Sequence, residues 1–288
     1  MPEFTLIRAR LIRRIIKALK LNTASGPDGL PVRVFRECCD ELAPAIAVLV
    51  RFLIRIGFWP QPWRFHRIQP LYKKGAVSSP SNYRGVHLTN IIAKIVERAL
   101  ATVLVPHFDR AGAFGRDQWG FRKMRSCRDL VTLLVCRWIW ALDNGFKVGI
   151  YLSDISGAFD RVDRELLADD FRRYGVSGCL FRLLYSYLAP REASVVVQGC
   201  ASSNFTIEDE VFQGTVLGPP LWNVFFRDID DTILQCLFRI AKFAGDLTAY
   251  RNDCGKTSNV KIEADLKSCQ QACHHWGVAR RVTFDPAK

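Results

Sequence analysis

The stretch from Lys242 to Leu247, K-F-A-G-D-L, places a small residue, a glycine and one carboxylate between apolar residues. Gly-Asp is a favoured hairpin dipeptide, so this stretch predicts two antiparallel strands joined by a tight turn, with Asp246 at the tip. Another acid, Asp154, follows the strand pattern of residues 147–152. The chain is therefore predicted to form an antiparallel sheet with a carboxylate at the end of a strand and another at a turn.

Helical and strand patterns alternate irregularly along the rest of the chain. Helices are predicted over residues 5–20, 31–57, 88–108, 163–174, 178–188 and 258–277 and after Pro219-Pro220, and strands over 66–72, 193–198 and 205–212. The last two strands are close enough in sequence to form a second hairpin. This mixture favours an α+β fold.

Positive charge is concentrated in the first half of the chain. The 288 residues carry 41 Lys+Arg and 28 Asp+Glu, a net charge of +13. Residues 1–140 contain 24 basic and 9 acidic residues, whereas residues 141–288 contain 17 and 19. This distribution suits a polyanionic partner, nucleic acid before an anionic membrane surface. The basic face of the helix over residues 5–20 is either solvated or in contact with phosphates.

The ten cysteines show no disulfide framework, no CxxC motif and no preceding signal peptide. We therefore expect reduced thiols and an intracellular protein, in the nucleus or the cytoplasm. The nearest approach to a metal cluster is Cys269, Cys273, His274 and His275, but the two cysteines continue a helical apolar stripe with Leu266 and Trp276. A buried helix face is favoured over a zinc site.

No membrane span is predicted. The longest apolar run, residues 42–58, is interrupted by Arg51 and Arg55, and a span requires about 20 apolar residues. This run is better interpreted as an amphipathic or buried helix.

Paired acids at strand ends can hold two Mg²⁺ ions about 4 Å apart, an arrangement used for in-line phosphoryl transfer. The acids alone leave other interpretations open. Asp154 can begin a loop, and Asp160 or Asp163 can cap the following helix.

Seven short motifs accompany the acids in a fixed order. They are T-A-S-G-P-D-G at 23–29, P-S-N-Y-R at 80–84, Q-W-G-F-R at 118–122, D-I-S-G-A-F-D at 154–160, Q-G-T-V-L-G-P at 213–219, F-A-G-D at 243–246 and F-D-P-A-K at 284–288. Together they resemble the reverse transcriptases of non-long-terminal-repeat, LINE-type retrotransposons, over residues 22–288.

The resemblance implies a right-hand polymerase fold. It places a basic N-terminal helix at residues 1–21, the fingers at 22–145 and the palm at 146–288, with an antiparallel palm sheet packed on helices and the thumb missing. The implied activity is RNA-directed DNA synthesis, and the implied partners are an RNA template, a DNA primer and deoxynucleotides, with no membrane.

The resemblance also assigns roles to individual residues. Asp154 and Asp246 would be the catalytic metal ligands, for two Mg²⁺ or Mn²⁺ ions. Lys73, Arg84, Phe159, Gln213 and Gly214 would bind the incoming nucleotide, with Phe159 beneath the sugar, where its ring would exclude a 2′-hydroxyl. Arg122, Lys123 and Arg125 would contact nucleic acid, and Lys288 matches a late lysine proposed to protonate the pyrophosphate.

The chain departs from the family at the hairpin turn. The family has Phe-Ala-Asp-Asp there, and its first acid is the principal partner of the acid at Asp154, but this chain has Gly245. Neighbouring side chains on an extended segment point in opposite directions, so Asp246 is not expected to substitute. Three hypotheses follow: a reverse transcriptase domain impaired at its metal site, a catalytically dead nucleic-acid-binding remnant of a mobile element, or a basic helical adaptor unrelated to polymerases.

Overall fold

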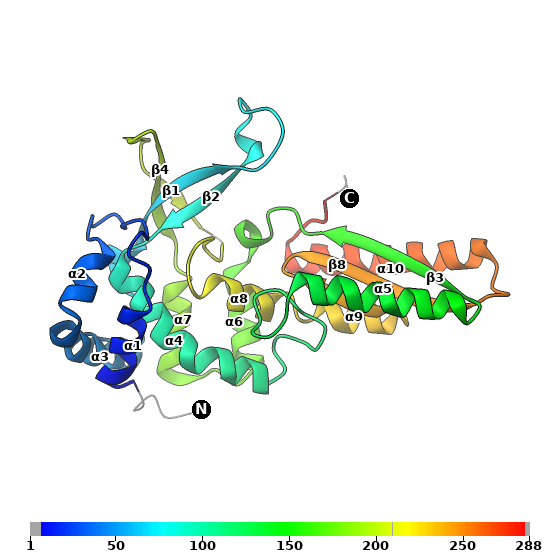
Figure 1. Ribbon diagram of the computed structural model, residues 1–288, viewed down its shortest axis with the longest axis horizontal. Coiled ribbons are helices and arrows are strands. Elements are labelled where there is room, and N and C mark those ends of the chain that lie inside the picture. The colour runs from blue at the N-terminus through cyan, green and yellow to red at the C-terminus, as the bar shows by residue number, and fades with distance from the viewer. Residues whose placement is uncertain (1–6, 209, 286–288) are drawn as a thin grey trace.

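The computed structural model describes residues 7–208 and 210–285. Helices and two sheets form an elongated molecule in which a helical part carries strand hairpins on one side and a sheet flanked by helices extends from one end (Figure 1). The predicted α+β architecture is confirmed at this level, as a mixture of helices and mainly antiparallel sheets.

The larger sheet forms the two projecting hairpins. Its strands are β1 (Phe65–Tyr72), β2 (Tyr83–Leu88), β4 (Arg191–Val197), β5 (Cys200–Ala201) and β6 (Phe205–Ile207). β1 pairs antiparallel with β2 and parallel with β4, and β4 pairs antiparallel with β5 and β6. The parallel pair joins segments that lie more than 100 residues apart in the sequence.

The smaller sheet has the order β3-β8-β7 and is antiparallel throughout, with β3 at Phe146–Asp154, β7 at Arg239–Phe243 and β8 at Asp246–Cys254. Two long helices cover its opposite faces. Gly149 of β3 lies against Ile262 of α10 (Asn259–Arg280), whereas Tyr250 of β8 packs against Trp138 of α5 (Cys127–Asp143).

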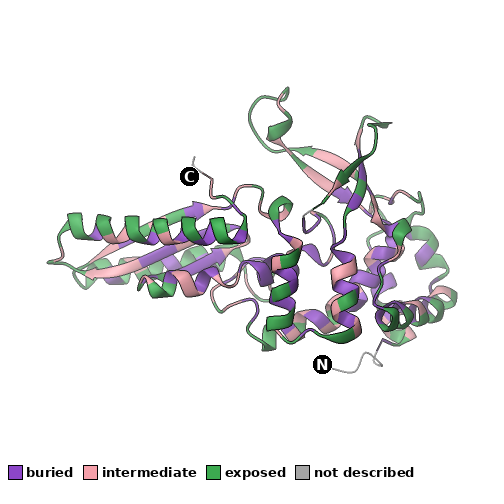
Figure 2. Ribbon diagram, turned by 180° about the vertical axis from the view of Figure 1, so that it is seen from behind, coloured by how far each residue is buried: buried purple, intermediate pink, exposed green. Residues whose placement is uncertain are grey.

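α9 (Ile229–Gln235) lies beside α10 and β7 at the smaller sheet (Figure 1). The remaining helices form the body of the molecule: α1 (Ala9–Lys17), α2 (Val32–Glu37), α3 (Cys39–Ile56), α4 (Ile91–Arg110), α6 (Arg164–Arg173), α7 (Gly178–Tyr187) and α8 (Gly218–Phe225). Buried residues follow the inner faces of these helices and continue into the smaller sheet (Figure 2). Trp59, Trp222 and Tyr187 are among the largest fully buried side chains. The core thus runs continuously from the helical body to the sheet beside it.

Most predicted elements are present, with shifted ends. The helix predicted over residues 31–57 is two helices, because Cys38 leaves the helical conformation between α2 and α3. The predicted basic N-terminal helix is α1, and residues 1–6 lie outside the described part of the chain. Among the described residues, no helix is both long and apolar enough to cross a membrane.

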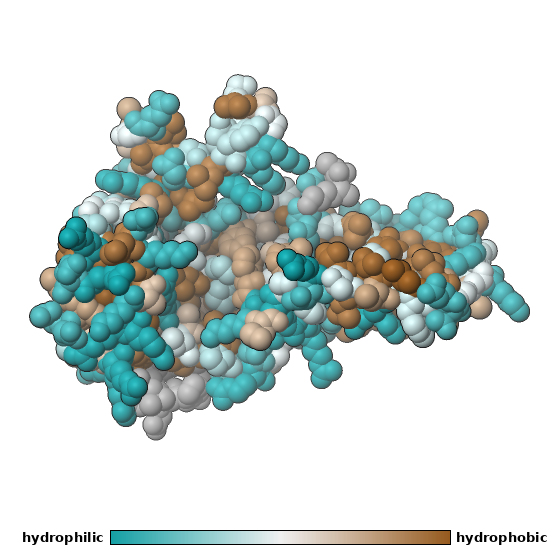
Figure 3. All heavy atoms as spheres, viewed as in Figure 1, coloured by the Kyte–Doolittle hydropathy of each residue, from teal (hydrophilic) through white to brown (hydrophobic). Residues whose placement is uncertain are grey.

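The sequence did not reveal α5, and its surface shows why. Besides the buried Leu130 and Leu134, Val131 and Ile139 of this helix are both 53% exposed. Together with exposed apolar residues of β3 they form the brown area over α5 and β3 in Figure 3. A helix that is apolar on nearly all sides has a weak 3.6-residue period, so the pattern that marks an amphipathic helix is absent.

A buried ion pair connects the smaller sheet to the helical body. The ammonium group of Lys242 on β7 is fully buried, pairs with the carboxylate of Asp230 on α9 and donates a hydrogen bond to the carbonyl oxygen of Phe226 at 2.9 Å. Burial lowers the pKa of Lys242 and raises the pKa of Asp230, and the attraction between the two charges opposes both shifts. Removing one partner therefore leaves the other charge buried.

We expect Lys242→Met to lower the free energy of unfolding by about 3 kcal/mol, because Asp230 loses its nearest cation and is left with Arg227, 3.5 Å away, to compensate its burial. Denaturant unfolding measures this change. The control is Lys256→Met at an exposed turn, with an expected change within about 0.5 kcal/mol. Equal unfolding midpoints for the parent and Lys242→Met would show that the pair does not stabilise the fold.

Candidate active site

The two predicted metal ligands, Asp154 and Asp246, lie side by side at one end of the smaller sheet. Asp154 ends β3, Asp246 begins β8, and the two are direct partners in the antiparallel register. Opposite residues in such a pair point to the same face of the sheet, with Cβ atoms about 4.5–5.5 Å apart. Two acids separated by more than 90 positions in sequence thus share one site.

Gly245 faces the same site from the turn. A Cβ atom at this position would lie 3.4 Å from Oδ1 of Asp154 and 3.4 Å from the Cβ atom of Ala158, both ordinary van der Waals contacts. The glycine is buried, and its φ lies outside the left-handed region that glycine favours. A Cβ atom at residue 245 would therefore have room, on the side of the turn that faces the carboxylate of Asp154.

The donor set at this end of the sheet is incomplete for a two-metal centre. Carboxylate oxygens are the right kind of ligand for Mg²⁺ or Mn²⁺. Within residues 7–208 and 210–285, however, no group of three or more His, Cys, Asp or Glu side chains is arranged to hold a metal ion. The residues present supply two carboxylates, and the position facing Asp154 has no side chain to supply a third.

Phe159 lies on the short helix η4 (Ala158–Arg161), directly after Ala158, which faces Gly245. Its ring stacks on Trp222 with centroids 6.0 Å apart and meets Phe121 edge to face at 5.9 Å. The side chain is only partly buried. Aromatic contacts on two sides therefore fix the orientation of a ring that is still partly accessible.

The loop containing Gln213 and Gly214 connects Phe159 to the β1–β2 hairpin. The amide of Val211 donates to the carbonyl oxygen of Phe159 at 2.9 Å, and the amide of His87 on β2 donates to the carbonyl oxygen of Gln213 at 2.8 Å. Gly214 has a φ of +99°. This left-handed conformation favours glycine and lets the loop turn closely against β2.

Buried polar side chains reinforce this connection. Nδ1 of His66 lies 3.0 Å from Nδ1 of His87, and Nε2 of His87 lies 3.1 Å from Oε1 of Glu210. Burial lowers the pKa of His87 to about 4 and raises the pKa of Glu210 to about 8. Burial therefore disfavours the charged form of both groups, and their contact adds a buried polar link between β2 and the loop that precedes Gln213.

Lys73 and Arg84 lie on the β1–β2 hairpin. Arg84 pairs with Leu71 across the hairpin, and the amide of Lys73 donates to the carbonyl oxygen of Asn82 at 2.8 Å. Both side chains are exposed. The hairpin projects from the helical body on the same side as the end of β3 that bears Asp154 (Figure 1).

The predicted nucleic-acid contacts at 122–125 divide into two groups. Arg122 donates to the carbonyl oxygen of Gly115 at 2.7 Å and pairs with Asp109, and its side chain is only 16% exposed. Arg125 donates to the carbonyl oxygen of Gln118 at 2.9 Å. Lys123 is exposed. The two arginines thus hold their own loop together, and the lysine faces solvent.

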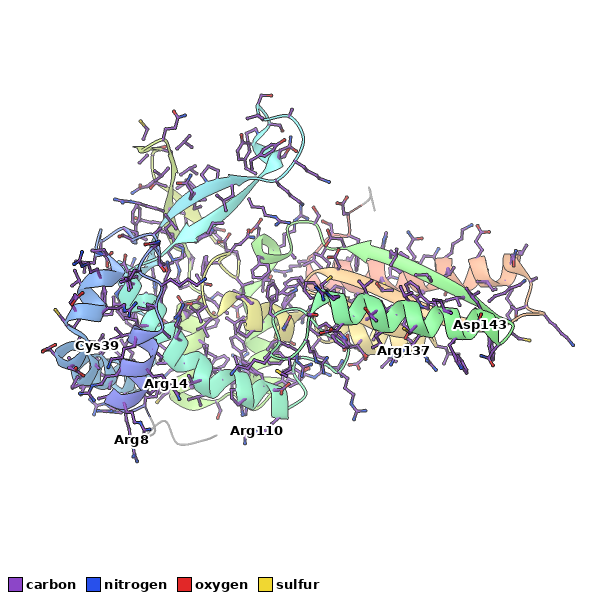
Figure 4. The ribbon with its side chains drawn as sticks, in the orientation of Figure 1. Arg8, Arg14, Cys39, Arg110, Arg137 and Asp143 are labelled. Carbon is purple, nitrogen blue, oxygen red and sulfur yellow. The ribbon has the colours of Figure 1, made fainter. Side chains whose placement is uncertain are left out.

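Other basic side chains lie elsewhere on the molecule. Arg8 and Arg14 belong to the region of α1, and Arg110 ends α4, on the side of the helical body away from the β1–β2 hairpin (Figure 4). The positive charge of the first half is therefore not gathered at one site.

Residues 71–288 match the family model described as "Reverse transcriptase (RNA-dependent DNA polymerase)". The chain belongs to the reverse transcriptase family. Its relatives include the RNA-directed DNA polymerase from mobile element jockey of Drosophila melanogaster, 29% identical over 282 residues, which cover 93% of this chain and 30% of the relative. The resemblance to LINE-type reverse transcriptases is confirmed.

Two further relatives are similar. The probable RNA-directed DNA polymerase from transposon BS of Drosophila melanogaster is 28% identical, over 94% of this chain and 30% of its own length. The jockey polymerase of Drosophila funebris is 26% identical, over 96% of this chain and 30% of its own length. This reverse transcriptase chain therefore spans about 30% of the length of these relatives.

Two residues that contact the turn were not predicted as site residues. The side chains of Gln118 and Trp222 are both fully buried and both donate hydrogen bonds to the carbonyl oxygen of Ala244, at 3.2 and 3.1 Å. The sequence signal was present, because Gln118 opens one of the matching motifs. The same motif carries Arg122, and the basic residues from Arg122 to Arg125 predict nucleic-acid contacts rather than support of a turn.

Gly120 and Gly245 lie on two sides of this turn and provide a matched pair of substitutions. A Cβ atom at Gly120 would lie 2.2 Å from the amide nitrogen of Ala244, whereas a Cβ atom at Gly245 has room. We expect Gly120→Ala to lower the free energy of unfolding by about 1–3 kcal/mol through overpacking. Gly245→Ala should leave it unchanged or raise it by about 0.4–1 kcal/mol, because alanine restricts the unfolded chain. Thermal or denaturant unfolding of both variants tests the difference, and equal effects would contradict it.

Proposed function

We propose that this chain is an RNA-directed DNA polymerase domain whose metal site is impaired by Gly245. Family membership gives the reaction class, and the pairing of Asp154 with Asp246 is the observation that supports the location of the site. In this proposal residues 22–145 are the fingers and residues 146–288 the palm, with the smaller sheet as the palm sheet.

The exposed cations of the β1–β2 hairpin would bind the incoming deoxynucleotide. Lys73 and Arg84 are solvent-accessible on one hairpin, and a guanidinium group matches phosphate oxygens with two parallel hydrogen bonds. Gln213 and Gly214, bound to the same hairpin through His87, would lie against the templating base pair. The loop and the hairpin would then hold the nucleotide together, the hairpin at its phosphates and the loop at its base pair.

Phe159 would lie beneath the sugar of that nucleotide. Its ring is held between Trp222 and Phe121, so it cannot turn aside without losing both aromatic contacts. A fixed ring at this place would clash with a 2′-hydroxyl, which favours deoxynucleotides over ribonucleotides.

An RNA template and a DNA primer would be the polyanionic partners of the basic half of the chain. Lys123 is the predicted contact that faces solvent, whereas Arg122 and Arg125 would act by shaping the loop beside it. Non-specific contacts of this kind are electrostatic and weaken as salt increases.

Asp154 and Asp246 would hold the Mg²⁺ or Mn²⁺ ions of the family. When bound, two such ions activate the primer 3′-hydroxyl and neutralise the leaving pyrophosphate. Loss of a group that merely orients a metal ligand costs about 10–100-fold in affinity or activity, and loss of a charged ligand should cost more. The second candidate function, a catalytically dead protein that binds nucleic acid, is favoured by the same observation, the glycine that faces Asp154.

We expect Gly245→Asp to increase Mg²⁺-dependent primer extension on an RNA template by at least about 10–100-fold. A Cβ atom at residue 245 has room 3.4 Å from Oδ1 of Asp154, so an aspartate there would bring a further carboxylate to this end of the sheet. Steady-state extension assays measure the gain, and Mn²⁺ binding followed by electron paramagnetic resonance tests the metal site independently of turnover.

The matched control is Gly245→Asn, which has nearly the same size and no charge. It should increase neither extension nor Mn²⁺ affinity. Robust extension by the unmodified chain would overturn the proposed impairment. Tighter Mn²⁺ binding without extension by Gly245→Asp would favour the nucleic-acid-binding protein over the polymerase.

The hairpin assignment predicts a loss of nucleotide binding. In the Gly245→Asp protein, replacing Lys73 and Arg84 by alanine should raise the KM for deoxynucleotides about 10-fold or more, because each removes charge-assisted hydrogen bonds to phosphate. Lys256→Ala, at the far end of the smaller sheet, should leave KM unchanged. An unchanged KM in the hairpin variant would exclude these residues from triphosphate binding.

Primer–template binding gives a separate expectation. Affinity measured by fluorescence anisotropy should fall steeply and linearly on a log–log plot as salt rises, with a slope near −0.9 for each phosphate neutralised on duplex. Salt-insensitive binding would contradict phosphate contacts by the basic half.

A further inference from the structure

The turn between β7 and β8 is held in an unfavourable backbone conformation. Ala244 has a φ of +56°, in the left-handed region that residues with a Cβ atom seldom adopt. Such a conformation costs of order 1–3 kcal/mol and persists only where the surroundings impose it. The residues around Ala244 therefore determine the shape of this turn.

One side chain binds both polar groups of Ala244. Oε1 of Gln118 accepts hydrogen bonds from the amides of Ala244 at 3.1 Å and Gly120 at 2.9 Å, and Nε2 donates to the carbonyl oxygen of Ala244 at 3.2 Å. The Gln118 side chain has no exposed surface. The amide group of Gln118 thus satisfies both the N–H and the C=O of Ala244, as the backbone of a neighbouring strand would.

The backbone around Gln118 is attached to β7 immediately before the turn. The amide of Lys242 donates to the carbonyl oxygen of Asp117, and the amide of Trp119 donates to the carbonyl oxygen of Lys242, both at 2.8 Å. Any displacement of Gln118 relative to the turn would break these bonds as well. The segment and the turn therefore form one rigid unit.

Helix α8 connects this unit to Phe159. Nε1 of Trp222 donates to the carbonyl oxygen of Ala244, and the ring of the same tryptophan stacks on Phe159. Nδ2 of Asn223 donates to the carbonyl oxygen of Gly120 at 3.1 Å. Trp222 therefore contacts both the turn at residues 244–246 and the ring of Phe159.

We propose that Gln118 and Trp222 are positioning residues that jointly fix the turn at residues 244–246 and the ring of Phe159 relative to Asp154. This proposal rests on the proposed polymerase function and deepens it. Gln118 fixes the conformation of the turn, and Trp222 connects the turn to the ring of Phe159. The position of Asp246 and the selection of the sugar would then both depend on the hydrogen bonds that these two buried side chains make to Ala244.

The first experiment does not depend on activity. Hydrogen exchange in the unmodified protein and in Gln118→Leu reports the opening of the turn through the amides of Ala244 and Gly120. We expect both amides to exchange at least 10-fold faster in the variant, with the amides in the middle of β8 unchanged. Gln270→Leu, at an exposed position of α10, is the control and should leave all of them unchanged.

The second experiment uses the Gly245→Asp protein. Gln118→Leu in that background should lower kcat about 10-fold or more with little change in the KM for deoxynucleotides, because the acids are displaced and the hairpin is not. Trp222→Phe, which retains stacking and removes the Nε1 donor, should reduce discrimination between deoxynucleotides and ribonucleotides several-fold.

Where Gln118→Leu does not fold, Gln118→Met is the second variant, since it keeps the length of the side chain but can neither accept from the two amides nor donate to the carbonyl oxygen of Ala244, and the same acceleration of exchange is expected. A variant that unfolds at lower temperature but shows unchanged Ala244 exchange in the folded state would overturn the proposal. So would unchanged kcat and unchanged sugar discrimination. An inactive Gly245→Asp protein with accelerated Ala244 exchange in Gln118→Leu would instead reject the polymerase assignment and retain the support of the turn.

Discussion

The antiparallel pairing of β3 with β8 is the constraint on which the candidate site depends. It runs over nine residue pairs, from Phe146 opposite Cys254 to Asp154 opposite Asp246. A shift of one residue would move every side chain of one strand to the other face. The register is fixed by packing along the whole strand pair, since Gly149 admits α10 on one face and Tyr250 contacts α5 on the other. The two acids therefore meet because of contacts far from them.

Buried charges connect this sheet to the helices behind it. Lys242 pairs with Asp230, and Arg280 at the end of α10 pairs with Asp170 of α6 and donates to the carbonyl oxygen of Phe225 at 2.9 Å. Burial raises the pKa of Asp170 to about 6 in spite of the arginine. Such pairs add little net stability over apolar packing, but each is satisfied in one arrangement only. They therefore favour a single position of the sheet against the body.

The elements with a clear period or a turn signal could be predicted from the sequence. The hairpin around Gly245 and the strand before Asp154 are examples, and their pairing followed from the family motifs. Helix α5 could not be predicted in this way, because its apolar residues lie on nearly all sides. The motif that begins at Gln118 marked this residue, but its contact with the turn could not be predicted, since a hydrogen bond from a side chain to the backbone of a residue 126 positions away depends on tertiary structure.

The two glycines beside the turn show that the change at residue 245 is chemical rather than architectural. Gly120 is required by the fold, because any side chain would collide with the backbone of Ala244. Gly245 is not, because its φ is ordinary and a Cβ atom has room. The hydrogen bonds that shape the turn come from Gln118 and Trp222, and none of them needs an acid at residue 245. The fold of the turn is therefore independent of a carboxylate at residue 245, and the hairpin, the loop at residues 211–214 and the ring of Phe159 keep their contacts without it.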